Sequence, residues 1–205
     1  RAFGARVGES PLECLSRVRV ERAAELLAAG TDKVADIAFR ARRVLGMNVT
    51  VIDLRARDIA YVRKKGDIMA VRPAWDALLA WAAEKGLGGP GVDFIGMADD
   101  PTLVPAEDCR FYACATLPDG FAREPGPVEY DRLEGGPHAV YEFYDRPDRI
   151  IFAYGLVIQD WMPESGYEQD PGRPCFEINL NDPASDPEGK SQLRICVPVR
   201  PAAPG

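Results

Sequence analysis

Glu177 is the residue of this chain whose type and setting point most directly to chemistry. It lies in Pro174–Pro183, where apolar and polar residues alternate as in a strand that ends at an Asn-Asp-Pro turn. One face would carry Phe176, Ile178 and Leu180, and the other Cys175, Glu177 and Asn179. A carboxylate removed from water must be paired, hydrogen-bonded or neutralised. A ligand cation could be that partner, with aromatic rings adding cation–π attraction. The alternatives are a wet rim or an ion pair with an arginine such as Arg110.

Aromatic side chains are the candidate walls of such a cation site. The candidates are Tyr61, Tyr112, Tyr141, Phe143, Trp161 and Tyr167. Any one of them could instead be a core residue, because aromatic rings fill protein interiors. Trp161 and Tyr141 are preferred, since one should close a helix beside the site and the other lies on a strand of the same repeat. Trp75 and Trp81 are expected in the core. Asn179 could orient a ligand or satisfy backbone groups.

The residues needed for several other kinds of site are missing from the sequence. The single histidine, His138, and five cysteines without a C-x-x-C pair argue against zinc, and there is no Ser-His-Asp set or phosphate loop. No cofactor is therefore expected. With 46% apolar and 28% charged residues, no membrane-length apolar run and no signal peptide, we expect a cytoplasmic protein with reduced thiols and no membrane partner.

An internal repeat indicates how these residues are positioned. Val49–Leu54 matches Val128–Leu133 at an offset of 79 residues, and Trp81 matches Trp161 at 80. Later segments match at 82, which places Phe94 on Phe176, Ile95 on Glu177 and Cys114 on Cys196. The charge of Glu177 thus replaces an apolar residue in the other copy.

Each copy is predicted to be a strand–helix–strand–strand unit preceded by one further strand. In the first copy the strands are Val49–Leu54, Asp58–Lys64, Phe94–Met97 and Cys109–Leu117, with a helix within residues 66–86. The last strand of the second copy should be Gln192–Val199. Local composition favours a strand for Ile150–Ile158, but the repeat predicts a helix there. The predicted fold class is α+β.

The first 46 residues have a different character. They carry a net charge of +3, whereas the remaining residues carry −10. The segments Gly8–Pro11, Arg19–Leu27 and Val34–Phe39 resemble the DNA-binding region of AraC-type transcription regulators. The resemblance implies an all-α helix-turn-helix segment over residues 1–46, with Arg1, Arg6 and Arg40 toward DNA. The pattern departs from the family after Ala41, and both recognition helices are incomplete, so we expect weak, non-specific DNA binding by this chain and tighter binding by a full-length parent.

Residues 47–205 form the second expected domain. Phe94–Pro101, Trp161–Glu168 and Pro174–Pro183 resemble the GyrI-like effector-binding domain. That resemblance implies two related units around a central groove, with an acidic residue at the position of Glu177. It also implies a ligand-responsive transcriptional regulator that binds a small cationic or aromatic effector and could form a homodimer. The alternatives are a hydrolase of strained electrophiles with Glu177 as general base, and a module that binds another protein.

Overall fold

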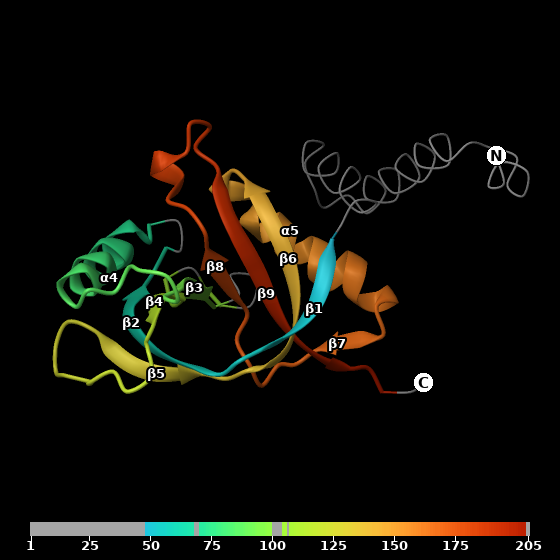
Figure 1. The fold of residues 1–205 in the computed structure, drawn as a ribbon. Helices are drawn as coiled ribbons and strands as arrows, with labels where there is room; N and C mark the ends of the chain where they lie inside the picture. Colours follow the sequence, from blue (N-terminus) through green and yellow to red (C-terminus); the bar gives the residue numbers. More distant parts are fainter. Residues whose placement is uncertain (1–47, 68–69, 100–103, 106, 204–205) are drawn as a thin grey trace, which may run out of the picture.

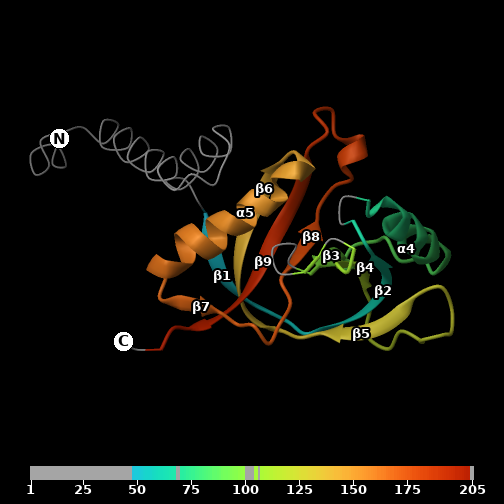
Figure 2. The ribbon, with the colours of Figure 1, turned by 180° about the vertical axis from the view of Figure 1, so that it is seen from behind.

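The fold is built around one antiparallel sheet that carries two helices. The structure is a computed structural model that describes residues 48–67, 70–99, 104–105 and 107–203. Within these residues nine strands are ordered β1-β6-β9-β8-β3-β4-β2-β5, and β7 pairs with β9. The sheet curls into a half-barrel, with β8 and β3 between the two helices (Figures 1 and 2). The expected N-terminal helix-turn-helix segment, with Arg1, Arg6 and Arg40, lies outside the described residues.

The elements occur in the same order in two successive units. The first unit contains β1 (Val49–Leu54), β2 (Arg57–Lys65), α4 (Arg72–Glu84), β3 (Phe94–Ala98) and β4 (Arg110–Thr116). The second contains β5 (Glu129–Leu133), β6 (Gly136–Asp145), α5 (Ile150–Gly155), β7 (Tyr167–Gln169), β8 (Phe176–Asn179) and β9 (Ser191–Pro201). Short 3-10 turns cover Pro147–Arg149, Met162–Glu164 and Pro183–Ser185, and the π-helical turn η3 covers Leu156–Trp161. The helix predicted for Ile150–Ile158 is therefore confirmed.

The ladders of the two units have matching registers. In the first unit, Ile59 of β2 pairs with Thr116 of β4. An offset of 79 takes Ile59 to His138 of β6, and an offset of 82 takes Thr116 to Pro198 of β9. These two residues also pair with each other. The expected match of Cys114 with Cys196 is therefore confirmed, since both lie at equivalent ladder positions.

The match of β3 with β8 is wrong by one residue. Cys114 pairs with Ile95, whereas Cys196 pairs with Phe176, so Ile95 and Phe176 are the equivalent residues. Both are almost fully buried, while Phe94 packs in the core under α4. The counterpart of Glu177 is consequently Gly96 and not Ile95. An offset of 81 for this strand follows from the ladder, which sequence similarity at 82 could not reveal.

The first strands of the two units are exchanged. β1 pairs with β6 of the second unit, and β5 pairs with β2 of the first. The registers are again equivalent, because Leu54 faces Gly136 and Leu133 faces Arg57. Each unit therefore needs a strand of the other to complete its sheet.

The two faces of the sheet bury different cores. On one face, α4 and α5 cover separate apolar clusters, one under each helix. On the other face, a third cluster joins the units and contains Ile59, Ile95, Phe176 and the thiols of Cys114 and Cys196. Burial raises the pKa of the Cys196 thiol to about 12, so this cysteine behaves as a small apolar core residue. No helix among the described residues is long and apolar enough to cross a membrane.

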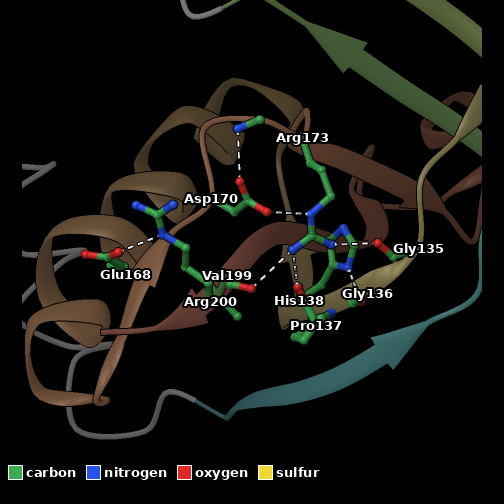
Figure 3. A network of polar contacts seen from close by, with 10 residues as sticks. Gly135, Gly136, Pro137, His138, Glu168, Asp170, Arg173, Val199 and Arg200 are labelled. Atoms are coloured by element: carbon green, nitrogen blue, oxygen red, sulfur yellow. Dashed lines mark hydrogen bonds and ion pairs between the residues drawn. The ribbon is translucent and has the colours of Figure 1, made fainter. Parts of the chain in front are cut away.

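Arg173 fixes the chain just before β8. Its Nε donates to Asp170 Oδ2 at 2.8 Å, and its terminal nitrogens donate to the carbonyl oxygens of Gly135 at 2.8 Å and of Pro137 and Val199 at 3.1 Å (Figure 3). The guanidinium therefore links the β5–β6 turn and β9 to the loop that enters β8. Because Arg173 is ion-paired and its side chain is only 13% exposed, these bonds restrain the strand that carries Glu177.

Candidate functional site

Glu177 lies at the centre of the helix-covered face of the sheet. Directly paired residues of neighbouring strands share a face, so the ladder defines one row across the sheet. From β2 to β1 this row contains Val62, Ala113, Gly96, Glu177, Ile195, Tyr141 and Val49. Glu177 is the charged member of an otherwise apolar row, between the strands that α4 and α5 cover.

Tyr154 of α5 is the hydrogen-bond partner of this carboxylate. Its hydroxyl donates to Glu177 Oε1 over 2.7 Å, and both side chains are only partly exposed. Within the described part of the chain, no lysine or arginine forms an ion pair with Glu177. Arg110, considered above as a partner, instead makes a two-point contact with Asp99. The carboxylate is thus stabilised by a neutral donor.

This setting perturbs the acidity of both groups. Burial raises the pKa of Glu177 to about 7, although the hydrogen bond from Tyr154 acts in the opposite direction. The pKa of Tyr154 lies well above its usual value, first because of burial and then because of the charge on Glu177. Near neutral pH, Glu177 can therefore exchange a proton or accept a cation, while Tyr154 remains a hydrogen-bond donor.

Two further aromatic rings and the other carboxylate oxygen lie around Gly96. A Cβ atom at Gly96 would lie 2.8 Å from Glu177 Oε2, 3.6 Å from Trp75 Cζ2 and 3.7 Å from Phe111 Cε2. Trp75 comes from α4 and Phe111 from β4, and their rings meet edge to face at 6.0 Å. Glu177, Trp75 and Phe111 therefore gather around Gly96, and Tyr154 of α5 donates to the carboxylate of Glu177. We refer to these five residues as the Glu177 site.

The structure brings few of the predicted wall residues to this site. Tyr141 and Phe143 share the face of Glu177, but both are buried under α5. Trp161 stacks on Tyr167 at a ring distance of 6.4 Å, in the same core cluster. Asn179 Nδ2 donates to the carbonyl of Phe94 at 3.3 Å, which is the backbone role considered above.

Tyr61 and Tyr112 lie on the opposite face of the sheet. Their rings meet edge to face at 5.6 Å and pack against the cluster that joins the two units. A small hollow on that face is lined by residues including Ile95, Phe176 and Leu133. The Glu177 site and these two tyrosines are therefore separated by the sheet.

Tyr154 and Phe111 were not named from sequence, and Trp75 was expected in the core, where it does pack against the cluster under α4. The repeat could have indicated Tyr154, because this residue follows Trp75 by 79 residues. The first strands of the two copies are separated by the same offset. The buried pairs Ala74/Ala153 and Leu78/Val157 share this offset, whereas Trp81 and Trp161 differ by 80. The π-helical turn η3 absorbs this extra residue, as such turns commonly do near functional sites.

Comparisons with known proteins agree with this fold. A DNA gyrase inhibitor of Edwardsiella ictaluri (strain 93-146) is 29% identical over 161 residues, which cover 75% of this chain and 99% of that relative. A hydrolase from Listeria innocua has the same fold, with a TM-score of 0.57 at 17% identity, over 74% of this chain and 91% of that one. EcmrR in its complex with DNA gives a TM-score of 0.59 at 13% identity, over 98% of this chain and 81% of that one.

The family follows from a match that spans most of the chain. The model of the GyrI-like small molecule binding domain matches residues 47–200. Apart from the last residue of β9, this range holds all the helices and strands of the described residues and all five residues of the Glu177 site. This chain therefore belongs to the family of GyrI-like small-molecule binding domains.

Proposed function

We propose that this chain binds a small aromatic cation at the Glu177 site and acts as the sensing part of a ligand-responsive transcriptional regulator. The observation that carries the proposal is the partly buried carboxylate of Glu177, which accepts a hydrogen bond from a tyrosine hydroxyl and lies with two aromatic rings around Gly96. An ionised carboxylate in such a place is costly without a counter-charge. A ligand cation would supply this counter-charge.

The rings make an aromatic cation the best-matched ligand class. Trp75 and Phe111 can offer apolar surface and cation–π attraction, at roughly 0.5–2 kcal/mol per ring. Tyr154 would keep one carboxylate oxygen oriented while the cation approaches the other. A neutral ligand would gain the apolar contacts but not the charge interaction.

The regulatory part of the proposal rests on the N-terminal segment. Residues 1–46 carry a net positive charge, whereas the rest of the chain is acidic. The similarity to EcmrR, whose structure contains DNA, extends over 98% of this chain. Ligand binding at the Glu177 site would then bias a basic DNA-binding module, with Arg1, Arg6 and Arg40 as its proposed DNA contacts. A homodimer remains part of this proposal.

The experiment is a titration of a cationic triarylmethane dye into wild type and Glu177→Gln. The substitution keeps shape but removes charge, so dye affinity should fall by about 1.5–3 kcal/mol, or roughly ten- to a hundredfold. A neutral aromatic of similar size should lose much less. Glu142→Gln is the matched control, because Glu142 is an exposed glutamate that pairs with Arg194. Unchanged dye affinity in Glu177→Gln would refute the proposal.

A hydrolase is the second candidate, and the Tyr154–Glu177 contact is the observation that favours it. A carboxylate with a pKa of about 7 is suited to accept a proton from water at neutral pH. The water oxygen would bond to the electrophilic carbon of a strained ring, the ring bond to that carbon would break, and the released ring atom would take up the proton held by Glu177. Mass spectrometry of incubated electrophiles should then show addition of one water by wild type but not by Glu177→Gln.

Binding to another protein is a third possibility. It is supported by the similarity to the Edwardsiella ictaluri DNA gyrase inhibitor. A supercoiling assay with purified DNA gyrase would test it, and inhibition that survives Glu177→Gln would separate this activity from the Glu177 site.

A further inference from the structure

The position opposite Glu177 is the one place in the central ladder where the side chain is missing. Gly96 of β3 pairs directly with Glu177 of β8. The register also makes Gly96 the equivalent of Glu177 in the first unit. A residue and its own repeat counterpart can face each other only at the pseudo-twofold axis that relates the units. This axis therefore passes through the Gly96–Glu177 pair.

Space at this axis is sufficient for one of the two side chains. A Cβ at Gly96 would lie 2.8 Å from Glu177 Oε2, which is too close for non-bonded atoms. Its distances to Trp75 and Phe111, 3.6 and 3.7 Å, are ordinary contacts. The backbone of Gly96 does not require glycine, because its φ angle is negative or extended. The carboxylate is thus the atom group that a methyl at this position would displace.

We propose that Gly96 is a positioning residue of the Glu177 site, whose missing side chain is the space that the carboxylate occupies. This inference rests on the proposed cation binding. Any side chain at position 96 displaces Oε2 from the space above Gly96, which Trp75 and Phe111 also border, and it strains the bond between Oε1 and Tyr154. The same glycine leaves one carboxylate on the axis, so the site would hold one singly charged cation in each chain.

The test compares Gly96→Ala with Gly88→Ala in the full chain. Gly88 also lacks a left-handed backbone, but a Cβ there meets nothing within 4 Å, which makes it a matched control. Gly96→Ala should weaken binding of the cationic dye about tenfold, the scale of one charged hydrogen bond, while Gly88→Ala should not change it. In Glu177→Gln, the added Gly96→Ala change should have no further effect on dye binding. Additive losses would overturn the inference.

A ligand-free readout separates this inference from the proposed function. NMR titration of the labelled Glu177 carboxyl should show a pKa shifted from about 7 in Gly96→Ala but not in Gly88→Ala. An unchanged titration together with unchanged dye affinity would refute the positioning role, even if Glu177→Gln abolishes binding. If Glu177→Gln leaves dye binding intact while the Gly96→Ala titration shifts, cation binding fails and the positioning stands.

Glu177→Asp tests the same idea if Gly96→Ala does not fold. It keeps the charge but withdraws the carboxylate from the space above Gly96 without altering β3. Dye affinity should again fall about tenfold. Affinity equal to that of wild type would show that the position of the carboxylate above Gly96 is unimportant.

Discussion

The two units share their ladders but differ in the size of the strand residues under their helices. In the first unit, β4 places the small residues Ala113 and Ala115 under α4. In the second, β9 places the larger residues Ile195 and Val197 at the equivalent positions under α5. The helices carry a large ring in both units, since Tyr154 stands where the first unit has Trp75. Backbone pairing is thus retained, while matching strand positions carry side chains of different volume.

The units differ most where they meet. Glu177 of the second unit faces Gly96 of the first, and α5 continues into a π-helical turn, whereas α4 is regular. Tyr154 occupies the place of Trp75, so one hydroxyl donor is added where the other unit has an indole ring. The polar groups of the site therefore come from the second unit, while the first contributes rings and space. A near-symmetric scaffold can in this way present a single charge.

Exchanging core volume between the units should have the largest effect. Ile195→Ala leaves a cavity in a fully buried position and should reduce the free energy of unfolding by about 2–5 kcal/mol. Ala113→Ile, the equivalent change in the first unit, should overpack that core and cost about 1–3 kcal/mol. Urea unfolding would measure both.

The control is Ile151→Ala at an exposed position of α5, which should change the free energy of unfolding by no more than about 0.5 kcal/mol. A neutral Ala113→Ile would contradict the volume comparison.

The charge of Glu177 should make stability depend on pH. Its pKa is raised from 4.5 to about 7 on folding, so the folded state binds the proton more tightly than the unfolded state. The stabilisation that Glu177 gives through this bound proton is therefore fully present below about pH 4.5 and is lost as the pH rises through about 7. The free energy of unfolding should fall by about 3 kcal/mol in total over this range. We expect the free energy of unfolding of wild type to fall relative to that of Glu177→Gln as the pH rises from 4 to 8. Parallel curves would place Glu177 in a solvated setting.

Removal of the hydroxyl that only the second unit supplies should have the smallest effect. Tyr154→Phe should weaken cationic dye binding by about 0.5–1.5 kcal/mol and raise the pKa of Glu177, because the donor to its ionised form is lost. Tyr144→Phe is the control, since its exposed hydroxyl also donates to a carboxylate, Asp186, at 3.0 Å. Equal effects of the two changes on dye binding would show that Tyr154 has no special role.

Much of the unit structure could be predicted from pattern and repetition. Val49–Leu54 was predicted with its observed bounds, and the repeat correctly identified the helix at Ile150–Ile158 against its strand-like composition. The short strand β7 (Tyr167–Gln169) was not predicted. Three residues that pair with β9 carry too little periodicity to be recognised.

The site was predicted less completely than the strands. Glu177 was chosen because its charge stands where the other copy was expected to carry the apolar Ile95. The counterpart is Gly96, but Glu177 does lie at the centre of the sheet. Tyr112 was chosen as a wall, although its neighbour Phe111 is the ring near Gly96. Alternation alone shows that adjacent residues point to opposite faces, but it does not show which face a helix will cover.

The sequence by itself therefore determined the local elements, the repeat, the charge at Glu177 and the GyrI-like resemblance. These properties depend on side-chain periodicity and on similarity along the chain. Only the tertiary structure decided the exchange of β1 and β5 and the one-residue shift that places Gly96 opposite Glu177. It also decided that Tyr154 contacts Glu177 and that Trp75 lies near Gly96. The reason is physical: strand register is set by ladders between distant segments, and a shift of one residue moves every side chain to the other face.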